Sequence, residues 1–152
     1  VAFDTFEGFP EITKEDGISA MMQKGQLAVA PDYYNFLTEV LKMHENANPL
    51  SHLKKHELRR GDATHEIHEF LRDCPETIVA LAYFDFDLFK PTKECLQAIK
   101  PRLVKGSVIG FDELNDPDSP GETLALMEVF GLNNVRLLKP TYASRVSYFI
   151  VE

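Results

Sequence analysis

Residues 78–89 read IVALAYFDFDLF, and the rest of the chain is organised around this stretch. The apolar run is rich in β-branched and aromatic residues and a helical pattern follows it, which predicts a parallel strand buried on both faces. Ligands of such sheets bind beyond the carboxyl ends of the strands. Asp85 and Asp87 stand two residues apart on one side of this strand end. Because unpaired carboxylates are costly to bury, the pair needs water, a cation or a proton to move.

A second acidic pair ends the next apolar run of the sequence. Residues 106–111 read GSVIGF, and Asp112 and Glu113 follow directly. If the two strands are neighbours, up to four carboxylates converge at one edge of the sheet. We take this edge as the candidate active site, although such a cluster can also be ordinary solvated surface.

Composition limits the class of protein. The chain has 152 residues, 44% of them hydrophobic, which predicts one domain spanning residues 1–152 with its own core. A net charge of −8 argues against nucleic acid or an anionic membrane as the main partner. No apolar run reaches the roughly 18 residues of a membrane helix, and no signal-peptide pattern opens the chain. Cys74 and Cys95 lack ligand spacing, which favours free thiols and a cytoplasmic location.

The start of the chain looks like the end of a strand. Residue 1 is Val, and residues 1–3 lead into Asp4, so we expect that an N-terminal segment is missing. An acid at the end of the second strand of a nucleotide-binding α/β fold commonly binds ribose hydroxyls, whereas an ordinary turn residue is the alternative. Residues 11–31 show no clean period and predict a long irregular segment, such as a lid.

Two helices are expected before the central strand. Residues 31–32 open the first, and an apolar stripe predicts that one face packs on the sheet: Tyr33, Phe36, Leu37, Val40 and Leu41. A weak strand around residues 56–60 precedes a second helix over residues 64–72. Asp62 suits the N-terminus of this helix, and a hydrogen bond to an adenine amino group is its functional alternative.

Alternation of strands and helices predicts a doubly wound α/β domain. A further helix is expected at residues 121–130. Residues 135–138 and 146–151 flank a short loop and predict an antiparallel pair at the sheet edge. A mostly parallel sheet with such a C-terminal antiparallel hairpin is typical of the Rossmann-like class I methyltransferases.

Four segments carry a closer resemblance. DTFEGFP at residues 4–10, GDA at 61–63, FDFDLFKPT at 84–92 and KGSVIGFDEL at 105–114 occur in the order seen in one family. Over essentially its whole length the chain resembles the macrocin-type O-methyltransferases. These enzymes depend on S-adenosylmethionine and a metal ion, and they methylate sugar hydroxyls of natural products.

The resemblance implies a cofactor site made by two of these segments. Asp4 would bind the cofactor ribose, with Thr5 and Phe6 nearby. Asp62 and Ala63 would line the adenine site. The glycine-rich loop that holds the methionine part of the cofactor in the family is absent, and it would lie before Val1.

The resemblance also implies a magnesium site. Asp85 and Asp112 would be ligands, together with Glu113 where the family usually has a second Asp. Asp87 would be the general base. The Glu113 side chain is one methylene longer than the Asp that the family usually has at this position.

This chemistry is sensible in its own right. A sugar hydroxyl is a poor nucleophile, and an oxygen-liganded cation such as Mg²⁺ would lower its pKa while a carboxylate takes the proton. Hard carboxylates favour Mg²⁺ over zinc. The expected partner is a small, sugar-like hydroxyl acceptor, and a homo-oligomer is compatible with the resemblance.

Three alternatives stay open. A haloacid-dehalogenase-type phosphotransferase also uses Mg²⁺ and Asp-x-Asp at a strand end, although Leu88 and Phe89 replace its usual next residues. A glycosyltransferase would leave Asp4 and Asp62 unexplained. A non-catalytic α/β binding domain would carry the acids as solvated surface.

Overall fold

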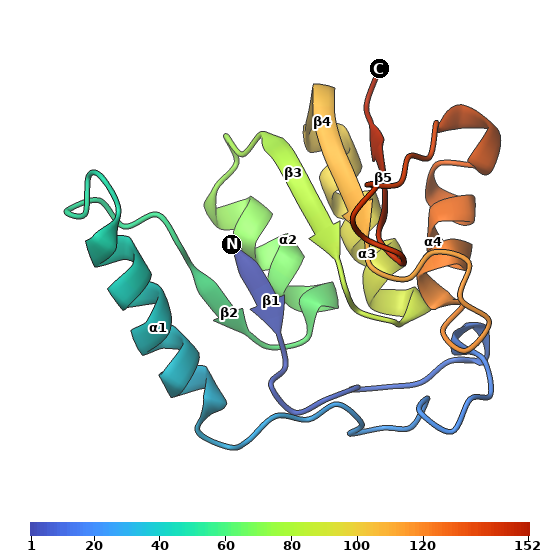
Figure 1. The fold of residues 1–152 in the computed structure, drawn as a ribbon, viewed down its shortest axis with the longest axis horizontal. Helices are drawn as coiled ribbons and strands as arrows, with labels where there is room; N and C mark the ends of the chain where they lie inside the picture. Colours follow the sequence, from blue (N-terminus) through green and yellow to red (C-terminus); the bar gives the residue numbers. More distant parts are fainter.

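The computed structural model describes residues 1–152 as an α/β fold whose strands form two groups (Figure 1). β1 (Ala2–Asp4) pairs in parallel with β2 (Leu58–Arg60). The second group has the order β3-β4-β5, with β3 (Val79–Phe84) parallel to β4 (Leu103–Phe111) and β5 (Ser147–Ile150) antiparallel to it. The predicted α/β class, with a late antiparallel strand on a mostly parallel arrangement, is confirmed.

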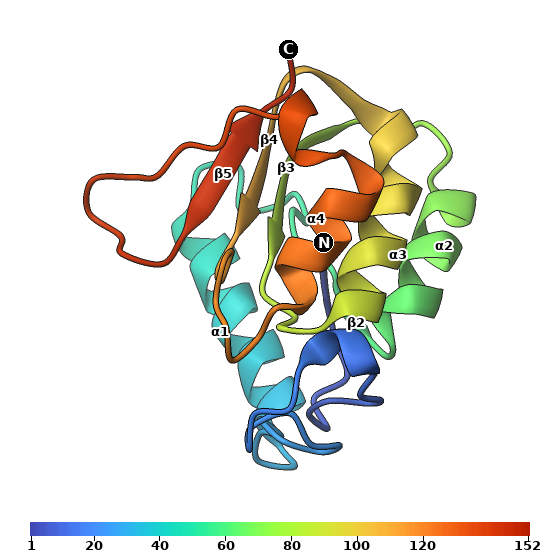
Figure 2. The same cartoon turned by 90° about the vertical axis from the view of Figure 1, so that its right-hand side faces the viewer.

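The helices lie mainly on one side of the strands. α2 (Ala63–Asp73), α3 (Phe89–Ile99) and α4 (Gly121–Val129) stand together on one face of β3–β5, whereas α1 (Tyr33–Ala47) stands apart beside β2 (Figures 1 and 2). Three short 3₁₀ turns complete the chain: η1 (Lys14–Asp16), η2 (Lys100–Arg102) and η3 (Leu132–Asn134).

The core lies between β3–β5 and the helices. Phe84 and Phe111 stack with ring centroids 5.4 Å apart, and Phe111 and Phe149 with centroids 6.5 Å apart. Leu96 of α3 and Leu126 of α4 are fully buried within the same cluster. The apolar run that predicted β3 therefore contributes its last aromatic residue to the centre of the core.

The prediction that β3 is buried on both faces is wrong. Leu81 is 68% exposed and Tyr83 is 52% exposed, whereas Phe84 is buried. The helices cover only the face to which Phe84 belongs, and the outer edge of β3 pairs with no strand. A cavity of about 720 Å³, lined mainly by apolar residues of β1, α2 and β3, lies beside this edge.

The expected packing of α1 on the sheet is also wrong. The helix forms where its pattern predicts it, but none of its residues is buried and Phe36 is 62% exposed. Tyr34 contacts the Phe6 ring edge-on, and the Arg60 guanidinium lies over the Tyr34 ring. An amphipathic pattern reveals an apolar stripe but not its partner. Here Tyr34, which lies outside the predicted stripe, makes the contacts to the loop after β1 and to β2.

The predicted terminal hairpin is reduced to a single bridge. β5 forms as expected, but residues 135–138 contribute only the antiparallel bridge between Leu138 and Tyr148. Pro140 has no N–H to extend the ladder beyond this bridge. β5 therefore takes its main partner from β4.

Both cysteines are free, as predicted, and Cys95 is buried. The helices of the structure include none with the length and apolar character that crossing a membrane requires.

Candidate functional site

The register of β3 and β4 brings the two acidic strand ends together. Phe84 pairs with Phe111 in parallel, so Asp85 and Asp112 leave the sheet side by side. The expectation that the two apolar runs are neighbouring strands is confirmed.

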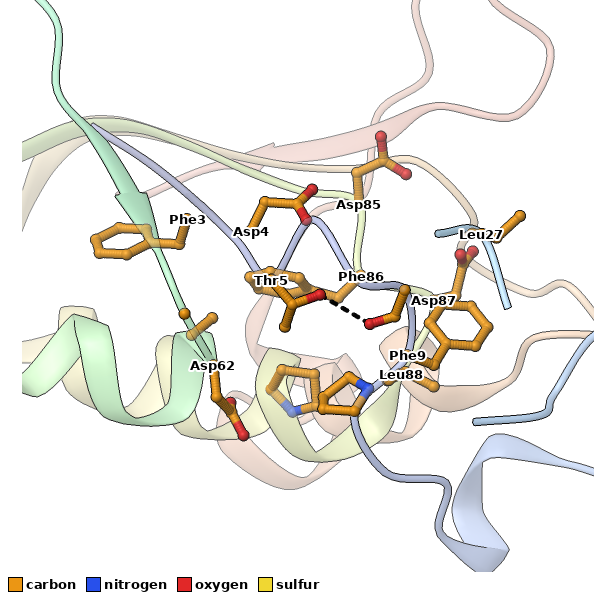
Figure 3. A pocket seen from close by; sticks show the side chains of 15 residues that line it. Phe3, Asp4, Thr5, Phe9, Leu27, Asp62, Asp85, Phe86, Asp87 and Leu88 are labelled. Atoms are coloured by element: carbon orange, nitrogen blue, oxygen red, sulfur yellow. Dashed lines mark hydrogen bonds between the residues drawn. The ribbon is translucent and has the colours of Figure 1, made fainter. Parts of the chain in front are cut away.

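A pocket of about 260 Å³ lies beyond the carboxyl ends of β1, β2 and β3 (Figure 3). Three of the four quoted segments meet there, and the pocket lining includes most of the predicted cofactor and acidic residues: Asp4, Thr5, Asp62, Ala63, Asp85 and Asp87. Phe6 is not part of the lining, because its buried ring packs against Tyr34.

The turn after β1 is tied by its own side chains. Asp4 Oδ1 accepts the Phe6 N–H at 2.6 Å, and the Thr5 hydroxyl donates to the Gly8 carbonyl at 2.8 Å. Gly8 has φ 77, and a Cβ there would lie 2.2 Å from the Gln26 carbonyl oxygen. The close approach of residues 25–26 thus requires glycine at position 8, and Gly8 and Leu27 both line the pocket.

Asp62 caps α2 and lines the pocket at the same time. Its Oδ1 accepts the Thr64 N–H at 2.9 Å and the Thr64 hydroxyl at 2.8 Å. The predicted capping role is confirmed. Since only Oδ1 takes part in these hydrogen bonds, the second carboxylate oxygen is available to a ligand.

The acidic residues after β3 hold their protons unusually tightly. Burial raises the pKa of Asp85, and the charges of Asp112 and Glu113 raise it further. Burial and the neighbouring Glu113 carboxyl raise the pKa of Asp87 from 3.8 to about 7. Asp87 also has a φ of 59, in the left-handed region that residues other than glycine seldom adopt.

The acidic residues after β4 have partners of their own. Asp112 accepts the Tyr83 hydroxyl at 2.6 Å. Glu113 accepts the Ser119 hydroxyl and forms an ion pair with Arg145. Neither Asp112 nor Glu113 lines the pocket that holds Asp85 and Asp87.

The carboxylates at this edge are suitable ligands for a hard cation, but they are not arranged around a common point. Their oxygens are the ligands that Mg²⁺ prefers. The pKa of Asp85 is raised mainly by burial and further by like charges, and a cation would relieve only the second effect. However, no three His, Cys, Asp or Glu side chains form a group that could hold one metal ion. Tyr83 and Arg145 engage Asp112 and Glu113 instead.

Sequence reasoning missed one acid at this edge. Glu122, in the first turn of α4, is fully buried, and burial raises its pKa to about 8. The signal in the sequence is weak, because an acid in the first turn of a helix is ordinarily an exposed residue that interacts favourably with the helix dipole.

Comparisons with known proteins point to methyltransferases. No protein-family model matches the chain, and no curated protein matches it. It is similar to the crystal structure of CalS11, a calicheamicin methyltransferase, with a TM-score of 0.93 and 39% identity over 97% of this chain. A second structure of CalS11, described as a TDP-rhamnose 3'-O-methyltransferase of calicheamicin biosynthesis, matches 80% of this chain with a TM-score of 0.76 and 39% identity.

The match covers only part of those proteins. The chain spans 58% of CalS11 in the first structure and 54% in the second. The O-methyltransferase NovP, at 20% identity and a TM-score of 0.58 over 98% of this chain and 58% of its own, supports the fold alone. The chain therefore has a Rossmann-like methyltransferase fold.

Proposed function

We propose that the protein is an S-adenosylmethionine-dependent O-methyltransferase that acts on a hydroxyl of a sugar or a related small molecule. One observation carries the proposal: residues after β1, β2 and β3, far apart in the sequence, line a single pocket at the carboxyl ends of these strands. The 39% identity to CalS11, a sugar O-methyltransferase, supports the same activity.

The charge of the pocket favours this cofactor. Four carboxylates line the pocket, and no Lys, Arg or His does: Asp4, Asp62, Asp85 and Asp87. Such a lining attracts a cationic sulfonium and repels phosphate groups that would lie within this pocket itself. The lining therefore suits a sulfonium cofactor without a metal ion, whereas the phosphotransferase and glycosyltransferase alternatives would need Mg²⁺ to hold phosphates beside these carboxylates.

Each polar residue of the pocket has a role in this proposal. Asp4 would accept hydrogen bonds from the ribose hydroxyls, with Thr5 holding the turn that presents it. Asp62 would accept from the adenine amino group through the oxygen that its capping role leaves free, and Ala63 would line the adenine plane. Phe6, which does not line the pocket, would support the turn after β1 through its packing against Tyr34.

Asp87 is the proposed general base. A base works best when its pKa lies near the working pH, and the pKa of Asp87 is about 7. As the pH rises through this value the carboxylate form becomes available, so methyl transfer measured without a divalent cation should increase with pH over the same range. Asp85, Asp112 and Glu113 would hold Mg²⁺ only once Tyr83 and Arg145 release Asp112 and Glu113, since as placed these carboxylates form no metal-binding group. A Mg²⁺ ion bound there would lower the pKa of the acceptor hydroxyl.

The cofactor claim is tested by titrating S-adenosylhomocysteine into the full-length gene product in a calorimeter. We expect binding by the wild-type protein and about tenfold weaker binding by Asp4→Asn, because a charged acceptor contributes roughly 1.5–3 kcal/mol to a hydrogen bond. The Asn side chain keeps an oxygen for the Phe6 N–H. Asp73→Asn, an exposed acid at the end of α2, is the matched control and should bind like wild type.

The reaction is tested with a nucleotide-linked sugar such as TDP-rhamnose as acceptor, with and without Mg²⁺. Formation of S-adenosylhomocysteine together with a methylated sugar would support the proposal. A folded protein that binds no S-adenosylhomocysteine would contradict it. Phosphate release from a phosphorylated substrate would then favour the phosphotransferase, and no turnover at all the binding domain.

A further inference from the structure

Glu122 is a fully buried acid at the candidate active site with no assigned role. Its side chain is 0% exposed and starts from the first turn of α4. None of the ion pairs in the molecule includes it. A buried acid without a cation costs free energy, so its hydrogen bonds must explain how it is tolerated.

The two carboxyl oxygens of Glu122 bind the two acidic strand ends. Oε1 accepts the N–H of Phe86 at 3.0 Å, and Oε2 accepts the N–H of Glu113 in a longer contact of 3.4 Å. Phe86 stands between Asp85 and Asp87, and Glu113 follows Asp112 directly. A single side chain thus links the segment after β3 to the segment after β4.

The preceding glycine explains how α4 comes close enough. A Cβ at Gly121 would lie 2.4 Å from the Phe89 nitrogen and 2.6 Å from the Asp87 carbonyl oxygen. Only glycine therefore lets the first turn of α4 rest on the backbone of residues 87–89. This contact places the Glu122 carboxyl within reach of the Phe86 and Glu113 N–H groups.

We infer that Glu122 is a positioning residue, which fixes the distance between the acidic segment after β3 and the acidic segment after β4. The expected effect on catalysis rests on the proposed function, because Asp87, the proposed general base, lies in the segment after β3. A neutral side chain with one acceptor oxygen can hold only one of the two segments. The carboxyl group of Glu122 holds both, because each of its two oxygens faces one of the two N–H groups.

The test compares Glu122→Gln with wild type. Gln has nearly the same volume but offers one acceptor oxygen, and its NH₂ group faces an N–H donor. In Glu122→Gln we expect kcat to fall about tenfold to a hundredfold, because small displacements of catalytic groups have effects of this size. KM for the acceptor and the affinity for S-adenosylhomocysteine should stay within about twofold, since Glu122 does not line the pocket. Glu128→Gln, an exposed acid of the same helix paired with Lys93, is the control.

Amide hydrogen exchange followed by NMR supplies the structural readout. We expect faster exchange at the Phe86 or Glu113 N–H in Glu122→Gln and unchanged exchange in Glu128→Gln. Unchanged kcat together with unchanged exchange would overturn the inference. So would a parallel loss of kcat, cofactor affinity and thermal stability, because that pattern belongs to a purely structural role. If wild type transfers no methyl group, the proposed function fails, while the exchange data still decide whether Glu122 holds both segments.

Discussion

Asp87 combines an unusual backbone conformation with an unusual pKa. Its φ of 59 lies in the left-handed region, which costs about 1 kcal/mol or more for a residue with a Cβ, although Asp tolerates it better than most. Strain of this kind persists where the surrounding structure holds it, often at functional sites. At this position the carboxyl meets Glu113 in a partly buried setting that raises its pKa to about 7.

The pKa of Asp87 predicts how stability depends on pH without divalent cations. The folded protein binds this proton more tightly than the unfolded chain, so the stability that the proton provides is present at low pH. It is lost as the pH rises from about 4 to about 7, the ordinary and the raised pKa of this carboxyl. Asp87→Asn removes the titration, so this variant should gain stability relative to wild type as the pH rises.

Urea unfolding of both proteins in EDTA, at several pH values across this range, measures the difference. The pKa of Glu122 is also raised, in part by the charge of Asp87, so the difference between the two proteins reports Asp87 together with its coupling to Glu122. A free-energy difference between the two proteins that does not change with pH would contradict the raised pKa of Asp87.

At the scale of elements, a buried turn anchors the long segment between β1 and α1. Asp16 of η1 is 0% exposed and accepts the Phe89 N–H at 2.6 Å, at the start of α3. It also accepts the N–H and the hydroxyl of Thr13, at 2.6 and 2.8 Å. The segment expected to be a lid is therefore anchored to the helix that follows the acidic strand end.

Asp16→Ala should release this anchor. The Phe89 N–H would lose its buried partner, and an unsatisfied buried group costs about 1–3 kcal/mol. We expect a loss of this size in the free energy of unfolding, measured with urea, and faster protease cleavage within residues 18–27. Glu39→Ala, an exposed acid of α1, is the control. Unchanged stability and cleavage would show that η1 is not an anchor.

At the scale of the whole molecule, the strands fall into two separate groups. β1 and β3 both line the cavity of about 720 Å³ between the groups, and neither pairs with the other. Ile78 and Leu81 are both 68% exposed at this cavity. Unpaired strand edges beside apolar surface are sites of association, because they offer both hydrogen bonds and hydrophobic contact.

In the folded chain of residues 1–152 this surface should bind a hydrophobic dye. We expect anilinonaphthalene sulfonate to fluoresce with the folded wild type and less with Leu81→Lys, since the lysine places a charge in the cavity. Leu53→Lys changes an exposed apolar residue that does not line the cavity and should leave the signal unchanged. Dye binding that appears only on unfolding would contradict the prediction.

Local sequence was enough to place the acidic residues at strand ends. The apolar runs stop at Phe84 and Phe111, and an acid follows each, so the positions of Asp85 and Asp112 beyond the sheet could be predicted. Helix boundaries came from similar local signals, as the capping hydrogen bonds of Asp62 illustrate. These features depend on residues a few positions apart, which a sequence displays directly.

Only the tertiary structure decided what these elements contact. The link from Glu122 to Phe86 joins residues 36 positions apart, and it needs the close approach at Gly121. The exposed side of β3 and the exposed stripe of α1 depend equally on which neighbours are present. Hydrophobic periodicity records that a face is apolar, whereas burial requires a second surface that the pattern does not specify. The sequence by itself therefore determined the elements and their acidic ends, and packing decided how those ends are held together.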